Sequence, residues 1–213
     1  MEYLLSLLPA MLAGTTITLK LFFLTLIMSL PLGVVGAIAR MSRFKPLNLL
    51  MQLYVWLFRG TPLLLQLLFM YYGLLIAGIR LERFTAAVLA FVLNYSAYYT
   101  EIYRGGIQSI DRGQYEAAHV LGLNRFQTMT RIILPQMFKV VLPPTSNEVI
   151  NLIKDTALIY AIGVSELLRV AKTAAVRDFS GTPFLVAAVF YLIMTGLIQQ
   201  FFKWLEKKYD YYG

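Results

Sequence analysis

Two carboxylates and an amide interrupt an apolar stretch near residue 150. Glu148, Asn151 and Asp155 follow one another at i, i+3 and i+7, which places all three on one face of a helix. A charged residue within an apolar span costs about 2.5 to 3.5 kcal/mol on insertion scales, so each carboxylate needs a cation, a hydrogen-bond donor or water. This face therefore predicts a path for a polar solute, and the carboxylates favour a solute with a cationic group.

A second polar face lies upstream, with its residues at i, i+4 and i+7, which also fall on one side of a helix. It consists of Asn94, Tyr98 and Glu101, while Thr61 and Gln66 add polar groups to another apolar stretch. We predict that these groups line the same cavity. The alternative is structural, because polar side chains also hydrogen-bond between neighbouring helices in membranes.

Structural roles stay open for the carboxylates as well. Asp155 can pair with Lys154 or with a neighbouring arginine. Glu148 and Glu101 can instead lie near the lipid headgroups. Spacing alone does not decide between these roles.

The composition is that of a membrane protein. Of 213 residues, 59% are hydrophobic and 14% are charged, whereas a soluble domain carries about 25% charged residues. There is no cysteine and one histidine, His119. Disulfides, iron–sulfur clusters and metal sites built from several histidines are therefore excluded, and no metal or cofactor is expected on this chain.

Helices that must position these groups need roughly 20 apolar residues each to cross a bilayer core. The sequence predicts an all-α integral membrane fold, a single domain over 1–213. Thr61-Pro62 is expected to cap and start the second span. Residues 47–58 are interpreted as an interfacial or tilted lead-in that joins this span at Arg59-Gly60. The five predicted spans are 15–39, 61–79, 85–103, 140–162 and 183–204.

Lysine and arginine set the expected orientation, because basic loops stay on the cytoplasmic side. The segments around 40–45, 104–139 and 203–208 hold most of these residues. We therefore expect the amino terminus outside and the carboxyl terminus in the cytoplasm. The net charge of +8 is mainly a topology signal, and no nucleic acid is expected as a partner. Residues 163–182 are expected to form an outer loop with a short helix.

The cytoplasmic loop 104–135 has its own pattern. Residues 114–121 predict a short helix, Gly122 a left-handed helix stop, and Asn124 the cap of a second helical piece. Pro135 predicts a break or a fresh helix start, and Pro143-Pro144 is expected to break the segment that follows, so that the fourth span starts afresh. The alternative for this loop is an interfacial helix that rests on lipid headgroups.

At this point the residues carry a resemblance. Glu116-Ala117-Ala118, then Gly122 after three residues, and Ile132 and Leu134-Pro135 further on resemble the EAA loop of importer permeases of the ATP-binding cassette class. Three further stretches are similar to the permeases for histidine, glutamine, glutamate and arginine. They are RGTPLLLQLLF (59–69), EIYRGGIQSIDRGQ (101–114) and NLIKDTALIYAIGVSEL (151–167).

The resemblance implies a type I importer permease fold in the bacterial inner membrane, with residues 116–118 on a cytoplasmic coupling helix that docks on a separate ATPase subunit. The alanines would permit close docking, Gly122 would fix the exit angle, and Glu116 would meet a basic group. Arg125 and Pro135 belong to the same coupling segment, although Arg125 can equally be a retention charge.

The partners follow from the same resemblance. The chain lacks the GxxxxGK[ST] nucleotide motif, so ATP and Mg would be bound by a dimer of the ATPase subunit, and this chain is not expected to be an enzyme. A second permease copy or a related paralogue and an extracytoplasmic solute-binding protein complete the expected assembly, embedded in membrane lipid. The expected substrate is a polar, basic amino acid. Glutamine or glutamate is the alternative; an ATP-independent channel or a membrane-embedded enzyme fits the sequence less well.

Overall fold

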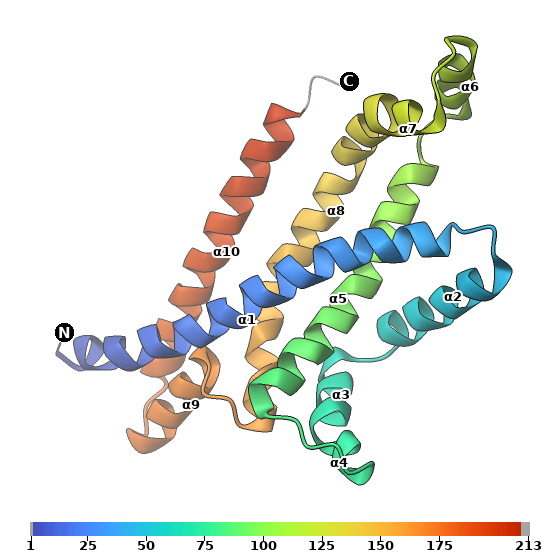
Figure 1. Ribbon diagram of the computed structural model, residues 1–213. Helices are drawn as coiled ribbons and strands as arrows, with labels where there is room; N and C mark the ends of the chain where they lie inside the picture. The colour runs from blue at the N-terminus through green and yellow to red at the C-terminus, as the bar shows by residue number, and fades with distance from the viewer. Residues whose placement is uncertain (1, 210–213) are drawn as a thin grey trace.

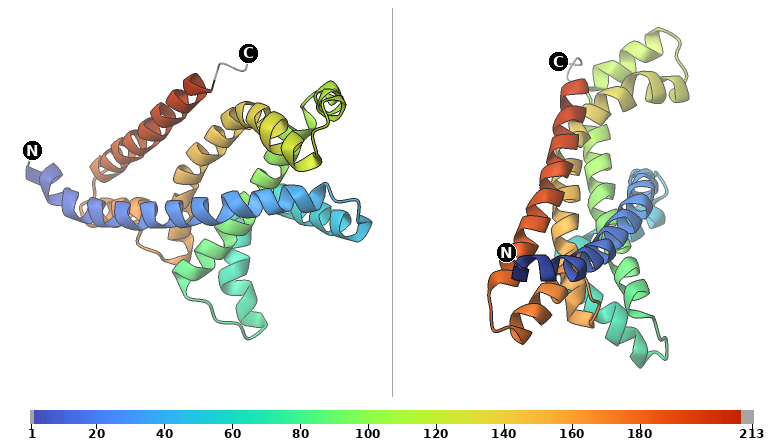
Figure 2. Two further views of the ribbon diagram at one scale, coloured as in Figure 1. Left: turned by 45° about the horizontal axis from the view of Figure 1, so that its top comes forward. Right: turned by 90° about the vertical axis from the view of Figure 1, so that its left-hand side faces the viewer.

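The structure, a computed structural model, describes residues 2–209, and these residues are helical with short turns and no strand. This confirms the predicted all-α class. Long helices α5, α8 and α10 run side by side, and α1 crosses them steeply (Figures 1 and 2). These helices span Glu2–Arg40 (α1), Arg83–Gln108 (α5), Leu134–Asp155 (α8) and Thr182–Lys208 (α10).

Glycines let α1 approach α5 closely. A Cβ added at Gly33 would meet the Cβ and the backbone of Tyr99, and one added at Gly36 would meet the side chain of Thr100. Tyr99 and Thr100 are fully buried at this crossing. Small residues at such contacts let helices pack in lipid, where burial of apolar surface gives no driving force. The crossing therefore fixes the helix that carries the upstream polar face.

Helices α1 and α10 are each long and apolar enough to cross a membrane. The predicted span 15–39 is only part of α1, because Leu7 and Met11 upstream of it are buried in the same core and continue the helix. The predicted span 183–204 lies inside α10, and 85–103 lies inside α5.

The predicted second span, 61–79, is helical over residues 63–76, which pass the test for a membrane span only together with the helix before them. Helix α2 leads into α3, a π-helical segment η1 and α4, and the chain bends by 105° between the two arms. The arms are long and apolar enough for one span only when they are taken together. Their bounds are Lys45–Gly60 (α2), Leu63–Leu68 (α3), Phe69–Gly73 (η1) and Leu74–Ile76 (α4).

The bend lies at Thr61-Pro62, one step beyond the predicted joint at Arg59-Gly60. Thr61 does not cap α3: its hydroxyl donates to the Leu57 carbonyl at 2.8 Å, and Pro62 holds the N-cap position. Proline forces the residue before it into extended backbone, and Thr61 has φ −119° and ψ 149°. The helix must therefore end where this proline follows. The lead-in interpretation of 47–58 agrees with α2.

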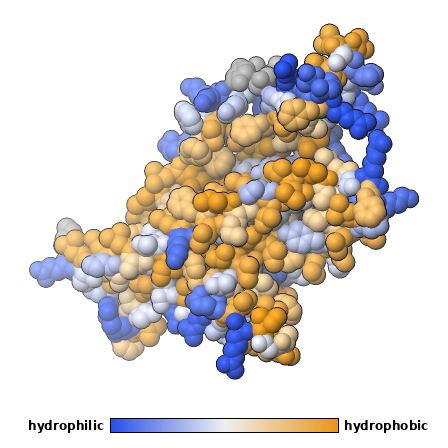
Figure 3. Space-filling model, viewed as in Figure 1, coloured by the Kyte–Doolittle hydropathy of each residue, from blue (hydrophilic) through white to orange (hydrophobic). Residues whose placement is uncertain are grey.

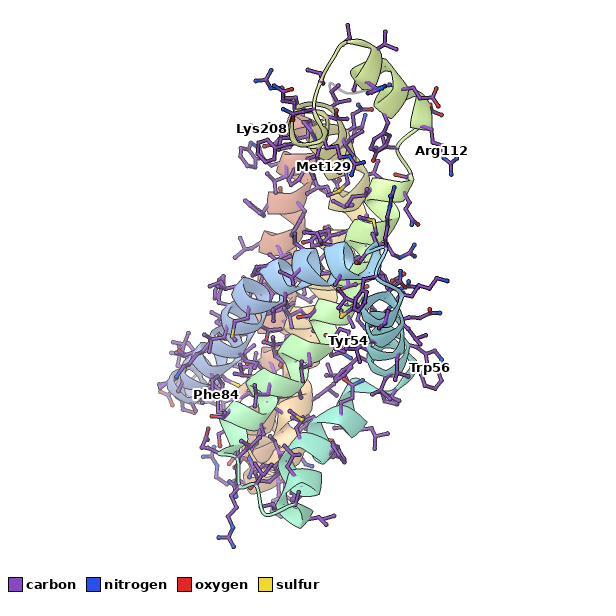
Figure 4. The ribbon with its side chains drawn as sticks, turned by 45° about the vertical axis from the view of Figure 1, so that its right-hand side comes forward. Tyr54, Trp56, Phe84, Arg112, Met129 and Lys208 are labelled. Carbon is purple, nitrogen blue, oxygen red and sulfur yellow. The ribbon has the colours of Figure 1, made fainter. Side chains whose placement is uncertain are left out.

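Helix α2 is amphipathic. The Tyr54 hydroxyl donates to the Leu93 carbonyl of α5 at 2.6 Å, whereas Trp56 is 69% exposed (Figure 4). At the start of α2, Asn48 accepts from the Arg40 guanidinium and donates to the Arg40 carbonyl, each at 2.6 Å. These contacts hold α2 against α1 and α5.

The expected break at Pro143-Pro144 is wrong, because both prolines lie inside continuous helix α8. They remove two N–H donors, but α8 packs between α5 and α10 and keeps its course. The break or fresh start predicted at Pro135 is only a change of helix type, because the backbone stays helical from residue 125 to residue 155. The chain is π-helical over η2 (Met129–Ile133) and becomes α-helical at Leu134, because proline cannot donate the next regular bond.

Short helices occupy the two ends of the long ones (Figure 1). The predicted short helix within 163–182 is confirmed by α9. In Figure 4, Arg112 and Met129 lie at the same end as Lys208, opposite Phe84. The orientation of these ends relative to the cytoplasm stays a prediction. The short elements are α6 (Arg112–Val120), α7 (Arg125–Thr128), the 3-10 helix η3 (Thr156–Ile162) and α9 (Leu167–Arg177).

Apolar side chains cover much of the face shown in Figure 3, and hydrophilic residues gather toward the ends of the molecule. Large residues on the long helices are widely exposed, including Ile27 (67%), Leu185 (70%) and Leu192 (71%). An apolar surface of this extent requires lipid or another apolar protein surface against it.

Candidate functional site

A cavity of about 680 Å³ opens at the bend between α2 and α3. The bend supplies residues 59–64, and helices α5 and α8 supply the walls. The predicted polar residues meet here from three separate parts of the chain. Those that line the cavity are Thr61, Asn94, Tyr98, Glu148, Asn151 and Asp155.

Asp155 receives a hydrogen bond that the sequence did not predict. The Tyr95 hydroxyl donates to Asp155 Oδ2 at 2.8 Å, and Tyr95 is otherwise buried. No ion pair joins Asp155 to Lys154 or to an arginine in residues 2–209. Tyr95 was missed because it stacks in an aromatic row with Phe91 and Tyr99, a pattern typical of a helix core.

Glu148 and Asn151 lie beside Asp155 on the same wall. Glu148 is half-buried, Asn151 is exposed to the cavity, and neither has a hydrogen-bond partner in the described chain. Their helical spacing predicted this shared face. Both side chains are therefore available to a solute.

Arg59 is the second residue that sequence analysis did not place in the site. It lines the cavity from the end of α2, and its guanidinium carbon lies 5.2 Å from the centre of the Tyr98 ring. No other lysine or arginine lines this cavity. The sequence predicted a joint at Arg59-Gly60, but it did not indicate that the bend brings the Arg59 side chain into the cavity.

Asn94 and Gln66 brace the bend. The Asn94 and Gln66 side-chain amides donate to the Phe58 carbonyl at 3.0 and 2.9 Å, and Asn94 also donates to Gln66 Oε1 at 3.0 Å. Gln66 donates further to the Thr61 hydroxyl at 2.8 Å. Carbonyls freed by a broken helix need partners at membrane depth, and these amides supply them. Gln66 does not line the cavity, so the structural alternative describes it better.

Glu101 faces a neighbouring cavity of about 390 Å³ and does not line the first. Its carboxylate forms an ion pair with Arg104 at 2.6 Å and lies 3.8 Å from Arg40. These two arginines neutralise Glu101 at the end of α5 nearest the loop, so it is not available to a solute in the larger cavity.

The loop at that end has the predicted local structure. Gly122 is left-handed with φ +73° after α6, and Asn124 caps α7 in a reciprocal capping box with Gln127. Glu116 and Ala117 are exposed on α6. Ala118 is wholly buried within the loop, so its side chain does not share the exposed face of α6, and its docking contact stays a prediction. The helix period turns it away from its exposed neighbours.

The remaining coupling residues differ in exposure. Arg125 is exposed at the start of α7, whereas Pro135 is half-buried in the first turn of α8. Three apolar side chains of the loop project outward, Val120 (86%), Leu121 (76%) and Phe126 (76%). The motif did not indicate them, because none of the three stands at one of its fixed positions.

No group of three or more His, Cys, Asp or Glu side chains in residues 2–209 has an arrangement that could hold a metal ion. The site therefore offers charge and hydrogen bonding to a solute.

Comparison with known proteins identifies the architecture. Residues 29–211 match the family described as binding-protein-dependent transport system inner membrane component. A Rickettsia conorii protein named as the glutamine transport system permease GlnP is 38% identical over 212 residues, covering 97% of each chain. The arginine transport system permease protein ArtQ of Bacillus subtilis is 38% identical over 202 residues, covering 94% of this chain and 92% of that protein.

A solved structure shows the same fold. The crystal structure of an amino acid ABC transporter with histidines superposes with a TM-score of 0.90 at 36% identity, covering 97% of each chain. This match confirms the type I importer permease fold, and the apolar helices place the chain in the inner membrane as a multi-pass protein. The chain belongs to the family of binding-protein-dependent transport system inner membrane components, and within it groups with the amino acid permeases of ATP-binding cassette transporters.

Proposed function

We propose that this chain is the permease subunit through which an importer carries L-amino acids with a cationic side chain into the cell. The proposed substrates are arginine, lysine and histidine. ATP hydrolysis on a separate ATPase dimer drives the import, and a solute-binding protein delivers the substrate from outside.

The charge of the cavity carries this proposal. Two carboxylates, Glu148 and Asp155, and one cation, Arg59, line it. An amino acid with a cationic side chain has one carboxylate and two cations, the exact complement of this set. A cavity in low-dielectric surroundings selects strongly for such a match, because an unpaired charge there is costly.

The geometry suggests a pose. Asp155, oriented by the Tyr95 hydroxyl, and Glu148 receive the two cationic groups of the substrate. Arg59, which lines the same cavity from the end of α2, receives the α-carboxylate, while Asn151 adds an amide between the two carboxylates on α8. Bound in this way, the substrate leaves no charge of the cavity unpaired.

Glutamine or glutamate is the second candidate. The glutamine permease relative is as similar to this chain as the arginine permease relative, at 38% identity each. Asn151 lines the cavity and offers an amide to an uncharged side chain, whereas the Asn94 amide already donates to the Phe58 carbonyl and to Gln66. A neutral substrate would leave one of the two carboxylates without a cation.

The loop at the far end is the proposed contact with the ATPase. Its exposed apolar residues Val120, Leu121 and Phe126 surround the exit of α6, and Glu116 adds a charge on the same short helix. A second permease, identical or paralogous, would cover the open side of the cavity and part of the apolar helix surface.

The test is amino acid uptake and ATPase activity in proteoliposomes that contain the complete transporter. Asp155→Asn and Glu148→Gln are compared with Asp178→Asn, a matched carboxylate change outside the cavity. We expect the KM for arginine and lysine to rise about tenfold or more in the two cavity variants, in line with roughly 1.5–3 kcal/mol for a hydrogen bond to a charged group. The KM for glutamine should change much less.

Two results would contradict the proposal. Equal effects of both cavity variants on cationic and neutral amino acids would remove the charge argument and favour the glutamine candidate. Uptake at an unchanged rate without the ATPase subunit would identify a channel instead of an importer.

A further inference from the structure

Two cavities follow one another along α8 and share part of their walls. The larger holds Asp155 and Asn151, and the smaller, nearer the loop end of the helices, holds Glu101 and Asn147. The residues that line both are Arg59, Tyr98 and Glu148. These three side chains form the wall that the two cavities have in common.

The backbone and the side chain of Arg59 are held very differently. The backbone is held at the preceding residue, where the Phe58 carbonyl accepts two hydrogen bonds from the side-chain amides of Asn94 and Gln66. The side chain is exposed, and no hydrogen bond or ion pair joins it to another part of residues 2–209. Its guanidinium carbon lies 5.2 Å from the centre of the Tyr98 ring. A cation–π contact of an exposed arginine is weak enough to break and re-form.

Carboxylates lie on both sides of this arginine. Its charge acts on Glu148 at the larger cavity and on Glu101 at the smaller one, yet it is within ion-pair distance of neither. Glu101 is already neutralised by Arg104 and Arg40. Glu148 has no such partner, so it is the group for which Arg59 and an arriving cation compete.

We propose that Arg59, stacked on Tyr98, is the gate between the two cavities. It closes the passage while the larger cavity is empty. A cationic solute that engages Glu148 takes the place of the arginine charge there, and Arg59 then leaves the Tyr98 ring to pair with the α-carboxylate of the solute, which opens the way to the smaller cavity. The choice of a cationic solute rests on the proposed function, whereas the position of the barrier rests on the two cavities alone.

Thiol labelling tests the barrier directly, since the chain has no cysteine of its own. Asn147→Cys reports on the smaller cavity and Leu158→Cys on the larger, because each residue lines only that one. The complete transporter, with any ATPase cysteines replaced, is placed in proteoliposomes without nucleotide. A cationic, membrane-impermeant methanethiosulfonate is added from the side that carries the loop, and mass spectrometry follows the permease chain.

We expect Leu158→Cys to react at least tenfold more slowly than Asn147→Cys when Arg59 is present. Arg59→Ala should bring the two rates within about twofold, and Arg59→Lys, which keeps the charge without the planar stack, should lie between. Tyr98→Leu, which removes the ring beneath the arginine, should raise the Leu158→Cys rate in the same direction and serves if Arg59→Ala fails to assemble. Asn147→Cys is measured in the same backgrounds as the reference, because loss of the Arg59 charge changes the approach of a cationic reagent to both cavities, so the ratio of the two rates reports on the barrier.

The proposal is overturned if Leu158→Cys reacts as fast as Asn147→Cys in the unaltered background, or if its rate is the same with Arg59 and with Arg59→Ala or Tyr98→Leu. These rates do not depend on which amino acid is carried. Failure of the gate and failure of the proposed substrate class are therefore separate results.

Discussion

The close crossing of α1 and α5 makes Gly33 the most sensitive packing position to test. An alanine there would place its methyl group against Tyr99 Cβ, 3.2 Å from the Tyr99 carbonyl carbon and 3.3 Å from the Thr100 nitrogen. These neighbours are backbone and near-backbone atoms of a helix, so they cannot rotate away. The two helices must separate, which also weakens the contact between the Thr100 hydroxyl and the Gly33 carbonyl.

The expected cost follows from overpacking a tight contact, roughly 1–3 kcal/mol. For a chain of this size that corresponds to a fall in melting temperature of roughly 2–12 °C. Alanine also raises helix propensity by about 1 kcal/mol relative to glycine, which would mask part of the effect. Gly196→Ala in α10 is the matched control, because a Cβ there meets nothing within 4 Å and gains the same propensity.

The assay is the melting temperature of the detergent-solubilised transporter, measured by the loss of monodisperse protein after heating. The difference between Gly33→Ala and Gly196→Ala isolates the packing cost. Equal melting temperatures for the two variants would refute the reasoning, because they would show that a methyl group fits between α1 and α5 without cost.

Three further outcomes follow from single contacts. Tyr95→Phe removes the donor to Asp155, so the KM for uptake of a basic amino acid should rise about tenfold while basal ATPase activity stays constant. The Arg177 guanidinium, aided by the Tyr3 hydroxyl, holds the pKa of Asp178 at about 2, so its stabilisation is complete above the unfolded pKa of about 3.9 and is lost as pH falls through 2. The melting temperatures of native protein and Asp178→Asn should therefore differ by a constant amount from pH 5 to 8 and converge below pH 4. Gly122→Ala forces a side chain into φ +73° at a cost of about 1 kcal/mol, and should uncouple ATPase activity from uptake while the transporter still assembles.

The helical period and the capping preferences of single residues predicted the structural features that depend only on residues close in sequence. The shared face of Glu148, Asn151 and Asp155 follows from 3.6 residues per turn, and the left-handed Gly122 and the Asn124 cap follow from backbone preferences. These features require no knowledge of the tertiary fold.

What the sequence did not predict depends on contacts between distant segments. Arg59 enters the cavity because the chain bends after it, and Tyr95 reaches Asp155 from another helix. Pro143-Pro144 was expected to break a helix that packing on both sides keeps continuous. Ala118 was assigned to a contact surface from its motif position, whereas its orientation on α6 buries it.

The π-helical segment η2 joins α7 to α8 without a break, so the exposed loop and the cavity carboxylates belong to one continuous rod. Its wide turn accommodates one additional residue. Compared with a regular helix, this rotates the loop by about 100° about the helix axis relative to Glu148 and Asp155. Deleting one residue there would change the length of the rod by only about 1.5 Å. The loop would nevertheless be rotated by about 100° about the helix axis relative to Glu148 and Asp155.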